Sequence, residues 1–229
     1  EIEKEFGTIS TRTFRGGTRG ALKIVYWSSV EKISSSVFQQ KLEKDIDLGK
    51  NKEDFSPFDI FQHIQDKNKK VQQSANETEL IVKDVSQILE KTEKQLLILS
   101  GNVSFIEFPK LLEKIESLVK AGISIKIISR VDLVSMSNIE KLLSLNFKYR
   151  KELIEVRHLE QPLRAFISDN KIFQIKELTK KTRNSEKQYY LSYIIKDKDW
   201  TNWMSRIFWK FYSNSIDSMK RIEELKKLK

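Results

Sequence analysis

From residue 95 onward, short apolar runs alternate with segments whose apolar residues recur every three or four positions. The apolar runs predict strands, as in a sheet with both faces buried, at 96–99, 123–128 and 189–195. Helical spacing predicts helices over 104–119, 137–145 and 199–222. This regular order predicts an α/β domain, within a chain that is α+β overall.

The stretch 154–177, in the middle of this domain, predicts one strand followed by a hairpin. Apolar and polar residues alternate over Ile154–Leu159, which predicts a strand with one buried face. Leu163–Ile167 is apolar except for Arg164, and the polar residues Ser168–Lys171 follow as a turn before a second apolar run. Residues 163–176 are therefore expected to form a hairpin.

Arg164 and Asp169 stand at the two ends of the first hairpin strand, with an apolar run between them. A cation or a carboxylate held by a core strand is costly to bury without a partner. Two alternatives follow: the two side chains form a structural ion pair with each other, or they face a pocket.

The same residues resemble a motif of the phospholipase D superfamily, HxKxxxxD. In that register Arg164 takes the place of the motif's lysine, Asp169 is its aspartate, and Pro162 stands where the family has its nucleophilic histidine. His158 comes four residues before that position, and Lys176, Glu177 and Thr179 replace the glycine, serine and asparagine that follow the motif in active members. The resemblance implies a phospholipase D-like sandwich domain over 95–229 without hydrolytic activity.

Near the start of the chain, Phe6–Trp27 contains strand-forming residues on both sides of a Gly-Gly pair. This pattern predicts a two-stranded ribbon. Its charges are all basic: Arg12, Arg15, Arg19 and Lys23. Such a ribbon resembles the wing of a winged helix, which places arginines against DNA phosphates or in the minor groove. The alternative is a solvated edge hairpin.

The region between the ribbon and the α/β domain supplies two predicted helices. The first covers 30–48, and 1–48 would then form a winged-helix remnant of wing and helix. Segment 49–94 would hold a loop and a second helix with its apolar face at Leu80, Val85 and Leu89. This helix is either a linker or dimer helix or an ordinary packed helix.

Composition narrows the function classes. The chain has 229 residues, a net charge of +10, no cysteine and two histidines, His63 and His158. A basic surplus suits nucleic acid, and the missing cysteines fit a reducing cytoplasm and exclude thiolate metal sites. With only two histidines we also expect no His-rich metal site, and we expect no cofactor. No apolar run approaches the ~20 residues of a membrane span, so we expect no membrane partner.

The order of a wing, a linker helix and a phospholipase D-like domain resembles the archaeal TrmB-like transcriptional regulators. The chain begins at Glu1 without a methionine, so we expect the helix-turn-helix to lie upstream. The resemblance implies a regulator, not an enzyme, that binds double-stranded DNA, forms a homodimer and accepts a small-molecule effector. The candidate ligand or dimer cleft holds Arg157, His158, Arg164 and Asp169. The alternatives are a phosphodiesterase or nuclease, and a protein-interaction module without DNA binding.

Overall fold

The computed structural model describes residues 9–15, 21–27, 30–75, 77–178 and 189–227. It divides the chain into two compact units, Glu1–Asp45 and Ile46–Lys229. Each unit is described by itself.

The first unit contains an antiparallel hairpin of β1 (Ile9–Arg15) and β2 (Ala21–Trp27). The predicted two-stranded ribbon is therefore confirmed at the level of the backbone, whereas the Gly-Gly pair and Arg19 fall outside the described residues. Helix α2 (Val30–Leu48) follows, close to the predicted bounds.

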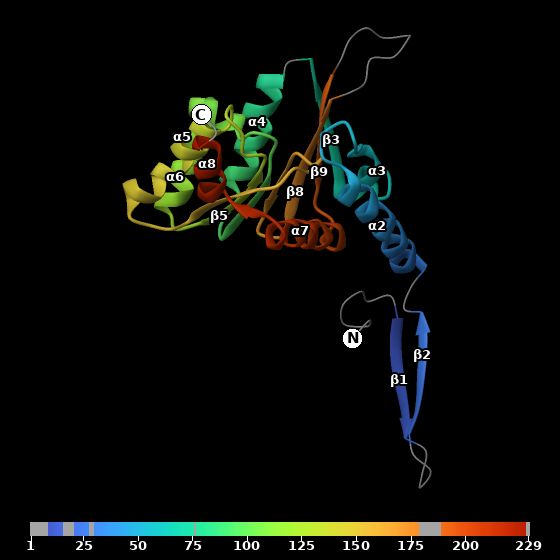
Figure 1. The fold of residues 1–229 in the computed structure, drawn as a ribbon. Coiled ribbons are helices and arrows are strands. Elements are labelled where there is room, and N and C mark those ends of the chain that lie inside the picture. Colours follow the sequence, from blue (N-terminus) through green and yellow to red (C-terminus); the bar gives the residue numbers. More distant parts are fainter. Residues whose placement is uncertain (1–8, 16–20, 28–29, 76, 179–188, 228–229) are drawn as a thin grey trace. The chain divides into compact units, whose positions relative to one another are not determined.

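The second unit is built on an eight-stranded mixed sheet, in the order β10-β6-β5-β4-β7-β8-β9-β3 (Figure 1). Its strands are β3 (Lys69–Ser74), β4 (Gln95–Leu99), β5 (Ser124–Ser129), β6 (Ile154–His158), β7 (Ala165–Ser168), β8 (Ile172–Leu178), β9 (Tyr190–Ile195) and β10 (Ile216–Asp217). Its helices are α3 (Phe58–Phe61), α4 (Glu77–Glu90), α5 (Pro109–Lys120), α6 (Met136–Tyr149), α7 (Lys198–Ser213) and α8 (Ser218–Lys226), with single 3-10 turns at Asp66–Asn68 and Ser104–Glu107. The expected α/β class is confirmed.

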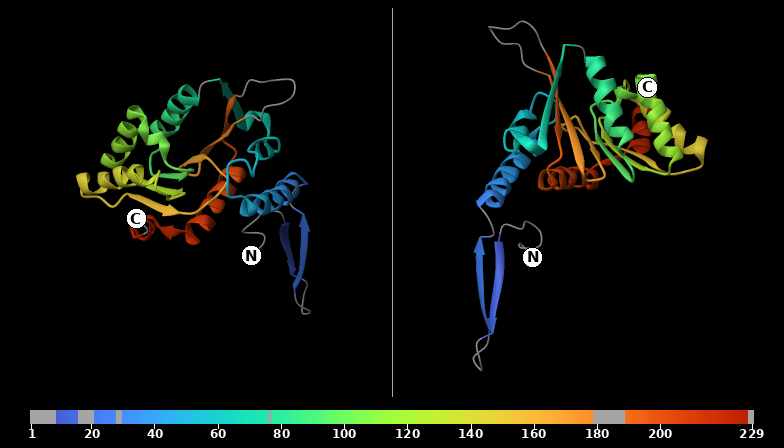
Figure 2. Two further views of the ribbon diagram at one scale, coloured as in Figure 1. Left: turned by 45° about the horizontal axis from the view of Figure 1, so that its top comes forward. Right: turned by 180° about the vertical axis from the view of Figure 1, so that it is seen from behind.

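Helices cover both faces of this sheet, which explains why its central strands are apolar throughout. Helices α4, α5 and α6 contact one face and α7 contacts the other (Figure 2). In β4, Leu96 and Ile98 belong to the core under α4 and α5, and Leu97 and Leu99 are equally buried. Strands β4, β5 and β6 are parallel, with α5 and α6 as the crossovers between them.

The hairpin of β7 and β8 follows the prediction closely. Ser168 O accepts a hydrogen bond from Lys171 N at 2.9 Å, and the two residues between them, Asp169 and Asn170, both have positive φ angles (52° and 53°). Two consecutive positive φ angles define the type I′ turn that matches the twist of a hairpin, and Asp and Asn tolerate this conformation well.

Segment 49–94 is not a separate linker in the structure. Strand β3 pairs with β9 at the edge of the main sheet, and Val85, Ile88 and Leu89 of α4 fill the same core as β4 and α5. Helix α4 is thus a packed helix of the second unit. The division between the two compact units falls after Asp45, and the expected domain boundaries at 48 and 94 stay predictions.

The single helix expected over 199–222 is wrong. Helix α7 ends at Ser213, the two-residue strand β10 pairs with β6, and α8 begins at Ser218. Asp217 fixes the start of α8, because its carboxylate accepts hydrogen bonds from the backbone N–H groups of Met219 and Lys220.

Candidate functional site

A cleft of about 610 Å³ opens beyond the carboxyl end of β4. At this strand the sheet changes direction, since the next strand in the chain, β5, lies on one side of β4 and β7 lies on the other. Ligands of open α/β sheets bind at such switch points. The lining residues that matter most are Ser100, Gly101 and Asn102 after β4, Arg130 after β5, Arg164 before β7 and Glu177 near the end of β8.

Arg164 is the central cation of this cleft. Its Nη1 donates hydrogen bonds to the carbonyl oxygens of Gln161 (3.1 Å) and Leu163 (2.7 Å), which fix the side chain. Burial lowers the pKa of Arg164, and the charge of Arg130 lowers it further. An arginine nevertheless stays protonated in proteins. Glu53, which also lines the cleft, acts to raise the pKa of Arg164. Within the described parts of the chain no carboxylate comes within ion-pair distance of it, so its charge is available to an anion.

Gly101 makes room for this guanidinium. A Cβ atom at position 101 would lie 2.8 Å from both Nε and Nη2 of Arg164. The backbone of the loop after β4 therefore approaches the arginine more closely than any other residue type would allow without movement.

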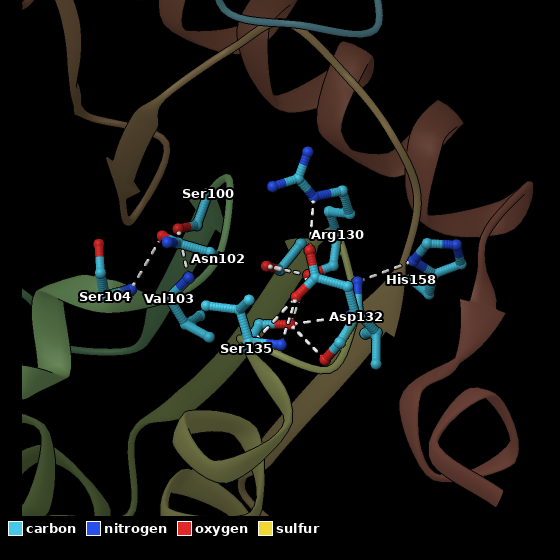
Figure 3. A network of polar contacts seen from close by, with 11 residues as sticks. Ser100, Asn102, Val103, Ser104, Arg130, Asp132, Ser135 and His158 are labelled. Carbon is cyan, nitrogen blue, oxygen red and sulfur yellow. Dashed lines mark hydrogen bonds and ion pairs between the residues drawn. The ribbon is translucent and has the colours of Figure 1, made fainter. Parts of the chain in front are cut away.

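A second cation, Arg130, comes from the loop after β5. Its Nε pairs with Asp132 Oδ2 at 2.9 Å, and Asp132 also accepts hydrogen bonds from the N–H groups of Val134 and Ser135. Burial acts to raise the pKa of Asp132, but these hydrogen bonds and the arginine outweigh it and the pKa is lowered. Figure 3 shows this network beside the loop of Ser100 and Asn102.

The position of the motif's nucleophile is closed. Pro162 is buried, and a Cβ atom on Gly49 would lie 2.8 Å from its Cγ. The turn after α2 that contains Gly49 is held by Asp54, whose Oδ2 accepts hydrogen bonds from Lys50 N and Asn51 N at 2.8 Å each. Proline offers no group that can attack phosphorus, and this turn covers its ring.

Asp169 lies at the far end of β7 from Arg164. Its carboxylate accepts hydrogen bonds from the backbone N–H groups of Glu93 (2.8 Å), Lys94 (2.9 Å) and Gln95 (2.8 Å). Burial acts to raise its pKa, but the three N–H donors outweigh burial and the pKa is lowered. Asp169 thus fastens the β7–β8 turn to the start of β4, and neither the predicted ion pair with Arg164 nor a place in the cleft is found for it.

Arg157 and His158 at the end of β6 also have partners away from the cleft. Arg157 donates to Ser215 Oγ (2.8 Å) and Ser215 O (2.6 Å) and lies over the ring of Tyr212. His158 Nδ1 accepts a hydrogen bond from Val131 N at 2.9 Å. Burial lowers the pKa of His158, and the charge of Arg221 acts in the same direction, so the neutral ring is favoured.

The four basic residues of the predicted DNA contact are placed only in part. The hairpin register pairs Arg12 with Ile24, Thr13 with Lys23 and Arg15 with Ala21. Directly paired residues lie on the same face of the ribbon, and successive positions of a strand alternate between faces. Positions 15 and 23 therefore lie on one face of the ribbon, and position 12 lies on the opposite face. Position 19 is outside the described residues.

Sequence reasoning missed Gly101, Arg130 and the loop 52–56 that closes one side of the cleft. Ser56 Oγ donates to Glu177 Oε1 at 2.6 Å, and Tyr193 OH donates to the other oxygen of Glu177 at 2.8 Å. The signal that could have found Gly101 and Arg130 is their place, since each stands two residues or fewer beyond the end of a predicted central strand.

No protein-family model and no curated protein sequence matches the chain. Solved structures with a similar arrangement include Nuc from Salmonella typhimurium, a phospholipase D family member, with 10% identity, 65% of this chain and 97% of that chain covered, and a TM-score of 0.47. NucT from Helicobacter pylori is 14% identical to this chain, and the match covers 65% of this chain and 98% of NucT, with a TM-score of 0.49. TrmBL2 is an archaeal chromatin protein whose structure shows a novel mode of DNA binding. It is 12% identical to this chain, and the match covers 94% of this chain and 79% of TrmBL2, with a TM-score of 0.49.

Membrane-spanning and metal-binding features are absent from the described part of the chain. There, no helix is both long and apolar enough to cross a bilayer. Likewise, no group of three or more metal-ligating side chains comes together among those residues.

Proposed function

We propose that the chain is a non-catalytic, DNA-binding transcriptional regulator of the TrmB-like kind, whose α/β domain binds a small anionic effector. The observation that carries the proposal is the cleft at the end of β4. It presents Arg164 against Gly101 with Arg130 beside it, while the position of the motif's nucleophile is the buried Pro162. The cleft can therefore hold an anion, and the motif supplies no group that would cleave one.

The effector that suits this cleft carries a phosphate or carboxylate group. Arginine binds such groups through two parallel hydrogen bonds, and charge-assisted hydrogen bonds are about twice as strong as neutral ones. Ser100 Oγ and Asn102 Oδ1 accept hydrogen bonds from Val103 N and Ser104 N, which fix the loop after β4. Arg164, with Arg130 beside it, is the charged group that recognises the anion.

DNA binding is assigned to the hairpin of β1 and β2. The net charge of +10 favours a polyanionic partner, and every charged residue between Phe6 and Trp27 is basic. A two-stranded ribbon can place such residues along the phosphates of a duplex or in its minor groove. Arg12, Arg15, Arg19 and Lys23 are the proposed contacts, and a homodimer would present two such ribbons to one operator.

Equilibrium binding to a fluorescent DNA duplex tests this function. The full chain should bind the duplex, and Arg12→Ala/Arg15→Ala/Arg19→Ala should weaken binding more than the charge-matched control Lys110→Ala/Lys141→Ala/Lys220→Ala. Sedimentation of the same samples measures whether the chain is a dimer. Equal weakening in both variants would favour a protein-interaction module with an edge hairpin.

A phosphodiesterase or nuclease is the competing function, because Arg164 stands where the phospholipase D motif has its phosphate-binding lysine. This function requires a nucleophile in the cleft. We expect no cleavage of supercoiled DNA or of bis(p-nitrophenyl) phosphate above the rate of a blank. Cleavage that Arg164→Ala abolishes would overturn the non-catalytic assignment.

A further inference from the structure

A second cavity, of about 290 Å³, lies between α4 and the sheet strands β3, β8 and β9. It shares no lining residue with the cleft at the end of β4. We call it the lysine-rimmed cavity, because its lining contains Lys67, Lys69, Lys70, Lys91 and Lys196. Its volume is just below the usual range for ligand sites, ~300–1,000 Å³, so it suits a small ligand.

The floor of the lysine-rimmed cavity is a buried polar network. Asp84 is 2% exposed and accepts hydrogen bonds from Ser192 and from the amide of Gln72, once that amide is turned so that its nitrogen faces the carboxylate. Gln174 is 1% exposed and donates through Nε2 to Ser192 Oγ at 2.6 Å. The carboxylate of Asp84 therefore already has hydrogen-bond donors within the fold.

One acceptor of this network is left over. Oε1 of Gln174 is buried and has no hydrogen-bond partner among the described residues. Buried polar atoms in folded proteins almost always have a partner, so a donor from outside the fold is expected at this atom. Gln174 lines the cavity, and a small movement of its side chain that exposes Oε1 would let a ligand there supply that donor.

The rim determines the charge of the ligand. Lys69 is occupied by an ion pair with Asp66 at 3.1 Å and a hydrogen bond to Phe61 O. Across the described ranges, Lys67, Lys70, Lys91 and Lys196 have no such ion pair. The one carboxylate of the lining is Asp84; burial raises its pKa, and the charge of Lys70 acts to lower it. Four ammonium groups around one small cavity favour a dianion and repel a cation.

We propose that the lysine-rimmed cavity is a second ligand site for a small phosphomonoester that carries hydroxyl groups. The lysines bind the phosphate, which is close to doubly charged at neutral pH, and Gln174 Oε1 accepts a hydrogen bond from a hydroxyl. A hydroxyl is favoured over an ammonium as the donor because the rim is cationic. This site is independent of the proposed cleft effector.

Calorimetric titration of the full chain tests the site, with glycerol 3-phosphate as the probe. Glycerol lacks the phosphate and should not bind, and ethyl phosphate lacks the hydroxyls and should bind more weakly. Lys91→Ala/Lys196→Ala should weaken binding by ~10-fold for each lysine removed. The control Lys110→Ala/Lys141→Ala removes the same charge from exposed positions on α5 and α6 and should bind as the wild type does.

Two further variants locate the ligand. Gln174→Met should remove the preference for glycerol 3-phosphate over ethyl phosphate, and circular dichroism checks that it folds. If it does not fold, the lysine variants alone decide. Arg164→Ala removes the arginine of the other cavity, which can also bind a phosphate, so in this background the probe should still bind and Lys91→Ala/Lys196→Ala should still weaken it. The proposal is overturned by absent binding of the probe to the wild type, by unchanged binding in the lysine variant, or by loss of all probe binding in Arg164→Ala.

Discussion

The guanidinium of Arg164 lies so close to Gly101 that a Cβ atom there would come within 2.8 Å of it. This contact joins the start of β7 to the loop after β4, two segments far apart in the sequence. It also keeps the arginine at the end of the central strand, where the proposed effector would bind.

Gly101→Ala should displace Arg164 from its place with little loss of stability, because the atoms it meets belong to the end of a flexible side chain. Anion binding in the cleft should fall about as far as it does in Arg164→Ala. The measurement is calorimetric titration with inorganic pyrophosphate in the Lys91→Ala/Lys196→Ala background, which removes lysines of the other cavity, with Lys110→Ala as a control. If Gly101→Ala binds pyrophosphate as tightly as the wild type, Gly101 does not position Arg164 for anion binding.

Asp169→Asn should destabilise the fold by about 1–3 kcal/mol at pH 7, because it weakens three hydrogen bonds to a charged acceptor. The pKa of Asp169 is lowered in the folded chain, so its contribution is fully present above the unfolded pKa of ~3.9 and is lost as pH falls through the lower folded value. Urea unfolding of both proteins should therefore show a difference at pH 7 that shrinks below about pH 4. A difference that is independent of pH would contradict this role.

Gly49→Ala should destabilise the second unit by about 1–3 kcal/mol, since its Cβ would meet the ring of Pro162 at 2.8 Å and Asp54 Cβ at 3.2 Å. Neither neighbour is the end of a flexible chain. Pro162→Ala removes the ring carbon that lies closest, so the double variant should lose less stability than the sum of the two single variants. Additive losses of stability would show that Gly49 does not cover Pro162.

The elements that sequence predicts well are those in which the pattern and the packing agree. The β7–β8 hairpin is predictable because apolar runs border the polar residues Ser168–Lys171, and the structure forms a tight turn there. Strand β3 escapes prediction because Lys69–Ser74 is almost entirely polar, as befits an exposed sheet edge.

The break between α7 and α8 escapes prediction for a different reason. Ile216 and Met219 continue the helical spacing of α7, yet they are 44% and 43% exposed and belong to β10 and α8. Spacing alone does not distinguish an apolar residue in the core from one at the surface.

The candidate site is predictable only in part, since its partners are distant in sequence. Arg164 stands out as a cation within an apolar run, and it does line a cleft. Asp169, Arg157 and His158 are grouped with it by the sequence, but each has a partner elsewhere: the backbone of 93–95, Ser215 and Val131. Interactions of this range depend on the sheet order, in which β7 returns beside β4, and local patterns do not contain that order.

The measurement that tests the central claim most directly is the salt dependence of DNA binding by the full chain. Fluorescence anisotropy of a labelled duplex should give an affinity that falls with salt, with a log–log slope of about 0.9 for each phosphate that the protein neutralises. In Arg12→Ala/Arg15→Ala/Arg19→Ala the slope should be shallower by up to about one unit for each arginine that binds a phosphate, and in Lys110→Ala/Lys141→Ala/Lys220→Ala it should be unchanged. A wild-type chain that does not bind, or a hairpin variant that keeps the wild-type affinity and slope, would contradict the assignment as a DNA-binding regulator.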